Sequence, residues 1–281
     1  MNLNSICVCG AGTMGSGIAQ AIAQSGYHVL LYEPNLSILE KAKTSIEKNL
    51  QTLTEKGKIN TGEKEKIFQR INFIHDVQAC LADLFIEAII ENEDIKISLF
   101  NQLAELNHSE VIFASNTSSL SVAKIAEKVM NPSRMIGMHF FNPATIMKLV
   151  EVVNTKYTNE HTTRTVVELT KAMGKTPVLC KDSPGFIVNR VARPYYIESL
   201  RLAEENIAGF EQADRLLEAT GFKMGPFKLM DLIGNDINYA VSCSVYEQMG
   251  QPERLKPSYI QEEKVKQGKL GKKSGEGYYS Y

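Results

Sequence analysis

A glycine-rich turn near the start of the chain constrains the fold more than any other feature. The short apolar run Ser5–Cys9 leads directly into residues 10–17, which read G-A-G-T-M-G-S-G. Apolar residues then recur at helical spacing over 18–23. A second apolar run, Tyr27–Tyr32, ends at the acidic residue Glu33. A strand, a glycine turn, a helix, a strand and an acid in this order are typical of the unit that opens a dinucleotide-binding half-sheet.

Three glycines of this segment each have a physical role in such a unit. Gly10 permits the tight turn, Gly12 lets the backbone approach a pyrophosphate, and Gly15 allows the helix to pack on the strand. The helix N-terminus then offers free N–H groups and about half a positive charge to the phosphates. The residues predicted to hold the dinucleotide are Gly10, Ala11, Gly12, Thr13, Met14 and Gly15. The alternative is a glycine-rich turn that only packs a helix on a strand.

Glu33 indicates which dinucleotide this turn would bind. It follows Gly15 by 18 residues, where a carboxylate can hydrogen-bond the adenosine ribose hydroxyls. A carboxylate about 4 Å from a 2′-phosphate is disfavoured by roughly 4 kcal/mol per unit charge at an effective dielectric constant of about 20. No arginine or lysine that could neutralise such a phosphate follows before Lys41. We therefore expect NAD rather than NADP as the cofactor.

Apolar periodicity predicts alternating strands and helices after this unit. The expected helices are 36–53, a helix capped by Asp94 that runs to Leu106, and 121–129, and the expected strands are 71–74, 84–90, 111–114 and 135–141. This alternation predicts an α/β fold, a Rossmann-type doubly wound sheet with helices on both faces.

The pattern changes after about residue 183. The ranges 186–206, 211–220 and 227–249 are helical in pattern and separated by glycines, and Pro194 is expected to kink the first helix near Arg193. We therefore expect an NAD-binding domain over residues 1–183 and a smaller all-α C-terminal domain over 184–281 for substrate binding and dimerisation. The length of 281 residues suits two such domains.

Composition excludes several classes of partner. The net charge is −1, so no overall basic field favours nucleic acid or an anionic membrane. No apolar stretch approaches the roughly 20 residues that a membrane span needs, and the first strand begins too early for a signal peptide. The five cysteines are irregularly spaced, which favours buried thiols in a reducing compartment over a disulfide framework or a metal site. We expect a cytoplasmic protein.

Two charged or polar residues lie in apolar runs that can pair with each other. His139 closes the apolar strand that begins at Met135, and Glu151 is the one charge in the run Leu149–Val153. If the two runs form a hairpin, His139 and Glu151 are cross-strand neighbours with Cβ atoms about 5 Å apart. A carboxylate on one imidazole nitrogen would fix the tautomer and leave the other nitrogen as a base. Alone, each residue also fits a bland interpretation, as a satisfied core histidine or an outward-facing glutamate.

Two further polar segments are candidates for ligand binding. The run Ala114–Ser119 follows a strand end, where ligands gather in open α/β sheets, although some of its hydroxyls must cap the next helix. Asn189 stands in the apolar stretch Phe186–Asn189 at the start of the second domain, where its amide either bonds locally or faces a ligand.

Several motifs together resemble the L-3-hydroxyacyl-CoA dehydrogenases, and most of all the short-chain 3-hydroxybutyryl-CoA dehydrogenases. The motifs are G-A-G-T-M-G-S-G, A-S-N-T-S-S-L, G-M-H-F-F-N-P, M-K-L-V-E-V, D-S-P-G-F-I-V-N-R, the G-P-F-x-L-x-D-x-I-G stretch from Gly225 and the terminal G-K-K-S-G-E-G-Y-Y. They run nearly end to end in the same order as in that family. One departure is the pair Cys7 and Cys9, where relatives usually carry aliphatic residues.

The resemblance implies roles for individual residues. His139 would take the proton from the substrate 3-hydroxyl while hydride passes to the nicotinamide, and Glu151 would orient that histidine. Ser118 and Asn189 would hydrogen-bond the reacting oxygen and the thioester side of the substrate. The residues implied to line the NAD site, beside the glycine turn and Glu33, are Glu91, Lys96, Ser118, Asn142 and Lys273. The residues implied near coenzyme A are Ser118, Asn49 and Lys56, although relatives have serine at position 49 and Lys56 also fits a solvated helix end.

The sequence therefore predicts an NAD-dependent enzyme that interconverts (S)-3-hydroxyacyl-CoA and 3-oxoacyl-CoA thioesters, and the resemblance implies a homodimer. Two alternatives are weighed against it. A dehydrogenase of a free hydroxy acid, similar to gulonate or carnitine dehydrogenase, would keep the His139–Glu151 pair without using Lys56. A non-catalytic NAD-binding protein would need neither this pair nor Lys56.

Overall fold

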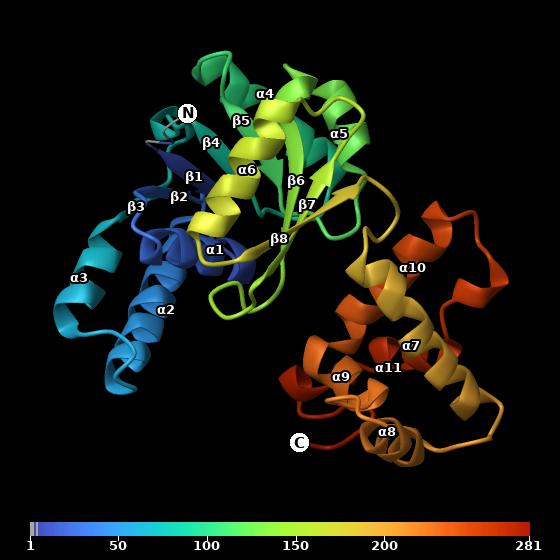
Figure 1. Cartoon of the computed structure of the whole chain (residues 1–281). Coiled ribbons are helices and arrows are strands. Elements are labelled where there is room, and N and C mark those ends of the chain that lie inside the picture. Colours follow the sequence, from blue (N-terminus) through green and yellow to red (C-terminus); the bar gives the residue numbers. More distant parts are fainter. Residues whose placement is uncertain (1–2, 4) are drawn as a thin grey trace. The chain divides into compact units, whose positions relative to one another are not determined.

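The computed structural model describes residue 3 and residues 5–281, which divide into two compact units, Met1–Asp182 and Ser183–Tyr281 (Figure 1). No helix among the described residues is both long and apolar enough to cross a membrane.

The first unit is built on one eight-stranded sheet with the order β3-β2-β1-β4-β5-β6-β7-β8. The strands are β1 (Ile6–Cys9), β2 (Val29–Tyr32), β3 (Ile71–Ile74), β4 (Leu84–Glu87), β5 (Ile112–Ser115), β6 (Met135–Phe140), β7 (Leu149–Asn154) and β8 (Thr176–Lys181). All neighbours are parallel except β6 and β7, which are antiparallel. The strand order reverses at β1, next to β4, so the carboxyl ends of these two strands form the switch point where doubly wound sheets bind ligands.

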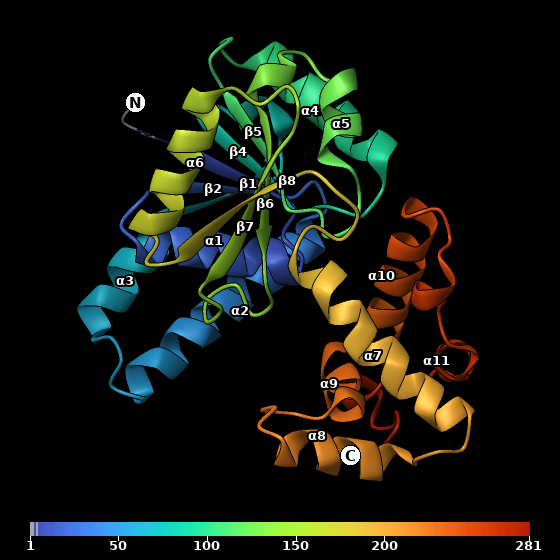
Figure 2. The same ribbon diagram turned by 45° about the vertical axis from the view of Figure 1, so that its right-hand side comes forward.

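Helices cover both faces of this sheet, as predicted (Figure 2). They are α1 (Thr13–Gln24), α2 (Leu36–Glu55), α3 (Thr61–Gln69), α4 (Glu93–Leu106), α5 (Val122–Lys128) and α6 (Glu160–Ala172). Buried residues of α1, α2 and α6 form one core with alternate side chains of the strands, such as Ile6 and Val8. On the opposite face, Phe100 of α4 packs against Phe113 of β5 with ring centroids 5.4 Å apart. The buried strands alternate between these two cores, which explains their nearly continuous apolar sequences.

Several local predictions for the first unit are wrong. Strand β4 ends at Glu87 rather than Ile90, and α4 is capped by Asn92, whose side chain accepts from the N–H of Ile95, so Asp94 lies in the first turn instead. Helix α3 was not predicted, although Asn60 and Glu63 form a capping box at its start. The sequence analysis also missed α6 and β8, because the threonines of α6 and the half-exposed residues of β8 give weak apolar patterns.

The second unit is helical, and its described residues contain no strand beyond isolated bridges near the C-terminus. Its helices are α7 (Val188–Glu204), α8 (Phe210–Ala219), α9 (Pro226–Ile233), α10 (Asn235–Gln248) and α11 (Tyr259–Lys266). The single helix predicted over 227–249 is wrong, because Gly234 separates α9 from α10 with a φ of 104° that a helix does not allow. Helix α11 was not predicted, and Pro194 lies inside α7.

Two buried carboxylates, on α8 and α9, hold the C-terminal segment against these helices. Asp231 of α9 accepts hydrogen bonds from the backbone N–H groups of Tyr278 and Tyr279, at 2.9 and 3.0 Å. Asp214 of α8 accepts from the N–H of Phe227 at 2.9 Å, and from the Tyr279 hydroxyl at 2.8 Å. The motif beginning at Gly225 and the terminal motif are therefore linked by contacts that satisfy backbone groups at the start of α9 and in the C-terminal segment.

Candidate active site

The glycine turn leaves no room for side chains at two positions. Gly10 has a φ of 100°, and a Cβ there would lie 2.6 Å from the carbonyl oxygen of Ala88. A Cβ on Gly15 would lie 1.7 Å from the carbonyl oxygen of Gly10. Helix α1 begins at Thr13, and its N-cap Gly12 has no side chain to cap it, so the first-turn N–H groups remain available to an anion. The turn therefore fits a dinucleotide pyrophosphate.

Glu33 is held against the same turn. Its carboxylate accepts hydrogen bonds from the N–H of Ala11 at 3.2 Å and from the N–H of Asn35 at 3.1 Å. The acid at the end of β2 is thus fixed beside the residues that follow β1. This is the position that a ribose-binding carboxylate requires.

A buried ionic network lies at the neighbouring ends of β4 and β5. Lys96 of α4 is 1% exposed, forms an ion pair with Glu87 and lies 3.1 Å from Glu91. Glu91 also accepts hydrogen bonds from the Thr117 hydroxyl and from the N–H of Ser118, the latter at 3.2 Å. The structure thus connects Glu91, Lys96 and Ser118, which the resemblance implied at the NAD site.

The two carboxylates of this network have opposite shifts. Burial raises the pKa of Glu87 above its ordinary value, although Lys96 and the hydroxyl of Ser115 act against this. Burial alone would also raise the pKa of Glu91, but the Lys96 charge and the hydrogen bonds from Thr117, Lys96 and Ser119 outweigh it and hold the pKa below its ordinary value. Glu91 therefore remains the ionised partner of Lys96.

His139 and Glu151 face each other as the hairpin prediction required. They are directly opposite in the antiparallel pairing of β6 and β7, and His139 Nδ1 lies 2.7 Å from Glu151 Oε2. Both are buried, with exposures of 6% and 1%. The ring of Phe141 packs against the imidazole with centroids 4.5 Å apart. A carboxylate at Nδ1 leaves Nε2 as the ring nitrogen that can exchange a proton with a ligand.

Two residues near these groups were not singled out by the sequence analysis. Glu87, like Glu151, is a charged residue inside an apolar run, but the prediction treated it only as part of the strand 84–90. Asn116 accepts a hydrogen bond from the N–H of Phe140 at 2.8 Å, which fastens the end of β6 directly after His139. Asn116 lies in the run Ala114–Ser119, but no local pattern predicts its contact with Phe140 because this contact spans 24 residues.

A cavity of about 370 Å³ lies beside the glycine turn. It is lined by Ala11, Gly12, Thr13, Ser16, Gly17, Ile38, Lys41, Ala42, Ser45, Asn49, Asn142, Pro143, Ala144 and Thr145. Asn142 and Asn49 therefore share one cavity, and Asn49 also donates to the side chain of Gln20 over 3.4 Å. Lys56 lies outside this lining, exposed at the C-terminal end of α2 and two helical turns beyond Asn49.

The second unit carries the two remaining predicted residues. Asn189 lies in the first turn of α7. Lys273 forms an ion pair with Asp236 of α10, with Nζ 2.6 Å from Oδ1. The backbone of Gly234 lies close to this lysine, because a Cβ atom added to Gly234 would lie 3.1 Å from Lys273 Nζ.

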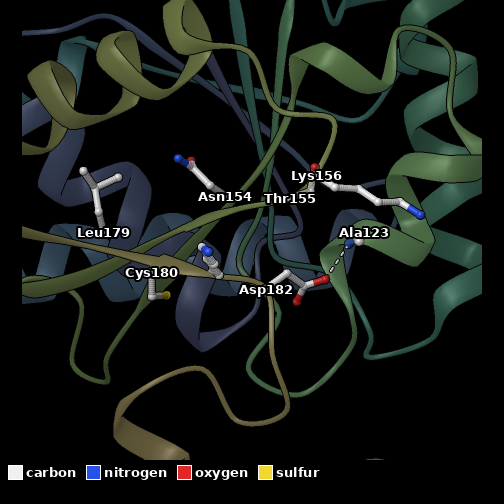
Figure 3. Close-up of a pocket in the computed structure, with 8 residues that line it drawn as sticks. Ala123, Asn154, Thr155, Lys156, Leu179, Cys180 and Asp182 are labelled. Atoms are coloured by element: carbon white, nitrogen blue, oxygen red, sulfur yellow. Dashed lines mark hydrogen bonds between the residues drawn. The ribbon is translucent and has the colours of Figure 1, made fainter.

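A larger cavity of about 780 Å³ holds none of the predicted site residues (Figure 3). It is lined by Ala123, Asn154, Thr155, Lys156, Leu179, Cys180, Lys181 and Asp182, at the ends of β7 and β8 and the start of α5. Asp182 accepts a hydrogen bond from the N–H of Ala123 at 2.8 Å, and both residues line the cavity.

The side chains of Cys7 and Cys9 in β1 point to the same face of the sheet, because alternate residues of a strand do so. Cys7 and Cys9 are buried free thiols with sulfur atoms 3.9 Å apart. Hydrogen bonding with the Cys80 and Cys9 thiols and burial raise the pKa of Cys7 well above its ordinary value. The Cys7 thiol is therefore protonated at neutral pH.

Comparison with known proteins places the chain in a family. Residues 5–183 match the family model described as 3-hydroxyacyl-CoA dehydrogenase, NAD binding domain, and residues 185–281 match the corresponding C-terminal domain. The chain is 45% identical to the 3-hydroxyadipyl-CoA dehydrogenase of Escherichia coli over all of its own length, but it spans only 60% of that protein. It is 41% identical to a Deinococcus radiodurans protein named "Probable 3-hydroxybutyryl-CoA dehydrogenase", covering 98% of this chain and 99% of that one.

A solved structure agrees with these matches. The crystal structure of (S)-3-hydroxybutyryl-CoA dehydrogenase from Ralstonia eutropha superimposes with a TM-score of 0.95 at 35% identity, covering 100% of this chain and 99% of that one. The Rossmann-type fold, the helical second unit and NAD as the cofactor are thereby confirmed. The chain belongs to the 3-hydroxyacyl-CoA dehydrogenase family and carries both of its domains.

Proposed function

We propose that this protein interconverts (S)-3-hydroxyacyl-CoA and 3-oxoacyl-CoA thioesters of short chain length, such as 3-hydroxybutyryl-CoA, with NAD. The observation that carries the proposal is the buried contact of 2.7 Å between His139 and Glu151 in a chain with the family's NAD-binding domain. The names of the relatives support the thioester as substrate. The proposal includes a cytoplasmic homodimer, and light scattering on the purified protein tests the dimer.

The proton chemistry follows from the geometry of the pair. NAD, when bound, supplies the group that accepts or donates a hydride at the 3-carbon. Glu151 accepts a hydrogen bond from Nδ1–H of His139, so that Nε2 is the base for the substrate 3-hydroxyl. Once Nε2 holds that proton, the carboxylate of Glu151 stabilises the imidazolium charge. In the reverse direction the same nitrogen returns the proton to the developing alkoxide.

The other site residues position the two ligands. Ser118 and Asn189 would hydrogen-bond the reacting oxygen and the thioester side of the substrate. Glu91 and Lys96 are linked to the Ser118 backbone through one network, so a substitution of either residue would change the position of Ser118. Glu33 and Asn142 would contact the cofactor, and so would Lys273, with the glycine turn holding its phosphates.

Coenzyme A binding is proposed along α2. Asn49 lines the cavity of about 370 Å³, and Lys56 follows it on the same side of the helix. The Lys56 ammonium would meet a phosphate of coenzyme A, while a free hydroxy acid would have no group to meet it. The contact therefore separates the proposal from the alternative of a free hydroxy acid dehydrogenase.

The first experiment offers the protein NADH and a ladder of 3-oxoacyl-CoA thioesters and follows NADH oxidation. We expect turnover, highest for short chains. The His139→Gln variant should still bind NADH, but its turnover should fall by roughly 10²–10⁴, the usual contribution of a positioned acid–base group. Near-normal turnover in that variant would overturn the proposed role of the pair.

The second experiment reverses the charge of Lys56. A unit-charge interaction at about 4 Å is worth roughly 1–4 kcal/mol between bulk water and a protein surface, so Lys56→Glu should raise the KM for acetoacetyl-CoA about tenfold. Lys66→Glu makes the same charge change on the exposed surface of α3 and serves as the control. An unchanged KM in the Lys56 variant would count against coenzyme A binding there and favour the free hydroxy acid.

A further inference from the structure

The loop between β6 and β7 forms one wall of the cavity of about 370 Å³ beside the glycine turn. Its residues 142–145 line this cavity together with the glycine turn, α1 and α2. Ala144 is 3% exposed and packs on α1, because a Cβ atom added to Gly17 would lie 3.3 Å from the Cβ of Ala144. The position of this loop therefore sets the width of the cavity on that side.

The hydrogen bonds within the loop are local. The carbonyl oxygen of Pro143 accepts hydrogen bonds from the N–H groups of Ile146 at 3.0 Å and Met147 at 2.9 Å. The side chains of Ile146 and Met147 are 71% and 40% exposed, so they contribute little packing. Backbone pairing with the sheet resumes at Lys148, whose carbonyl oxygen accepts from the N–H of Thr176 at 2.8 Å. The contacts within the loop therefore fix its shape but not its position beside the cavity.

The side chain of Lys175 connects this loop to the sheet. Lys175 lies between α6 and β8, and its Nζ donates to the carbonyl oxygens of Ala144 at 2.6 Å and Met147 at 2.8 Å. One ammonium thus holds both sides of the turn that the loop makes. The same ammonium lies 6.0 Å from the ring centroid of Phe140, a buried residue at the end of β6.

Lys175 acts on the loop and not in an ion pair. None of the ion pairs formed by the described residues includes Lys175. Burial lowers the pKa of Lys175, because its ammonium is partly removed from water. A hydrogen bond from a charged donor is roughly twice as strong as one between neutral groups. The two bonds to the loop carbonyls are therefore a strong anchor.

We propose that Lys175 is a positioning residue, which holds loop residues 142–147 against α1 and so keeps the cavity in the shape that the cofactor requires. The inference rests on the proposed function, because it uses Asn142 as a cofactor contact. Lys175 lies outside the lining of the cavity, and the pairing of β6 with β7 holds His139 opposite Glu151. Loss of the Lys175 ammonium should therefore weaken cofactor binding without slowing proton transfer.

The test removes the two hydrogen bonds with Lys175→Met, which keeps a long unbranched side chain. We expect the loop to be in place in about a tenth of the molecules, so that the Kd for NADH rises about tenfold, because the apparent Kd is the intrinsic value divided by the competent fraction. Fluorescence titration measures this Kd. At saturating NADH and acetoacetyl-CoA, kcat should stay within about threefold of the unaltered value. Lys175→Arg keeps a cationic donor and should keep the Kd within about threefold.

Hydrogen exchange provides a second measurement that does not depend on activity. The backbone amides of residues 144–148 should exchange faster in Lys175→Met, whereas those of β7, residues 149–154, should exchange as in the unaltered protein. The matched control is Lys171→Met, because Lys171 is an exposed lysine at the end of α6. This control should change neither the Kd for NADH nor the exchange of the loop.

The proposal is overturned if Lys175→Met binds NADH within about twofold of the unaltered protein, or if its kcat falls about tenfold or more. It is also overturned if Lys175→Arg weakens binding as much as Lys175→Met, or if exchange of the loop amides is unchanged. A protein that reduces no 3-oxoacyl-CoA thioester would instead refute the proposed function. The NADH titration and the hydrogen exchange would then still decide the role of Lys175, so the two failures are distinguishable.

Discussion

The imidazole of His139 can act as a base because its other nitrogen is occupied. Antiparallel pairing of β6 and β7 places Glu151 directly opposite, and the pair is buried under Phe141 where water competes little for the hydrogen bond. At the same scale, Glu33 is fixed by two backbone N–H groups rather than by another side chain. Single residues therefore define both the proposed proton path and the expected cofactor preference.

Removing the charge of Glu151 while keeping its shape tests the first of these roles. The side-chain oxygen of Gln in Glu151→Gln can still accept a hydrogen bond from Nδ1–H but cannot stabilise the imidazolium by charge, so we expect kcat to fall by about 10²-fold or more. The KM for the thioester and the Kd for NADH should change little. Glu160→Gln, at an exposed position of α6, is the control for loss of one carboxylate. A kcat within twofold of the unaltered enzyme would show that the charge of Glu151 is dispensable.

The second role is tested by the choice between NADH and NADPH. Steady-state kinetics should give a kcat/KM for NADH at least 100-fold above that for NADPH, because a 2′-phosphate beside Glu33 is opposed by roughly 4 kcal/mol. Glu33→Ser should reduce this preference by about tenfold or more. Glu40→Ser, on the exposed side of α2, should leave the preference unchanged. Equal efficiency of the two cofactors in the unaltered enzyme would contradict the assignment of Glu33.

At the scale of elements, the site is assembled where strands and helices end. The glycine turn and Glu33 directly follow the carboxyl ends of β1 and β2. Glu87 and Ser115 are the last residues of β4 and β5, and His139 is the last residue but one of β6. Lys96 reaches this edge from α4 and connects two of those strand ends through Glu87 and Glu91. In the second unit, Gly234 breaks one predicted helix in two and directs α10 so that Asp236 meets Lys273.

The conformation of Gly234 predicts the effect of a substitution at the break between α9 and α10. An alanine would be strained at a φ of 104°, and its Cβ would lie 3.0 Å from Asp236 Oδ1. We expect Gly234→Ala to lower the free energy of unfolding by roughly 1–3 kcal/mol, measured by urea denaturation. Gly62→Ala, inside α3, should have little or no destabilising effect because its Cβ meets only Asn60 Oδ1 at 3.4 Å. Equal effects of the two substitutions would mean that the conformation of Gly234 is not required.

The ionic network around Lys96 predicts how the stability of the folded protein changes at acidic pH. The pKa of Glu91 is lower in the folded protein than its ordinary value of 4.5, so its stabilisation is fully present above that pH and is lost as the pH falls through the folded pKa. Glu87 has a raised pKa and contributes in the opposite direction. Glu91→Gln should therefore lose less stability than the unaltered protein as the pH is lowered below about 4.5. Thermal melting at several pH values measures this, and parallel curves for both proteins would refute it.

At the scale of the whole molecule, the two units have separate cores. The first core joins α1, α2 and α6 to the sheet, and the second unit has clusters around Phe227 and around Val245 that contain residues of that unit alone. Most residues assigned to the cofactor lie in the first unit, whereas Lys273 and the proposed substrate contact Asn189 lie in the second. Cofactor binding and turnover are therefore expected to depend on the units differently.

A fragment of residues 1–182 tests this division of labour. It should bind NADH, with a Kd within about tenfold of that of the full chain, because only Lys273 is missing from the proposed cofactor contacts. It should show no turnover of 3-oxoacyl-CoA thioesters, since Asn189 is absent. Fluorescence titration with NADH and a turnover assay measure the two properties. Turnover by the fragment would show that the second unit is not needed for substrate binding.

The sequence by itself determined what short-range pattern can determine. The glycine turn, the acid after the second strand and the His139–Glu151 register are all set by spacing within one or two elements, and so the structure agrees with them. Tertiary structure alone decided the contacts between distant segments, such as Asn116 with Phe140, Lys96 with two carboxylates, and Arg193 with α10. The physical reason is that burial and charge compensation depend on which elements pack together, and local periodicity carries no information about that choice.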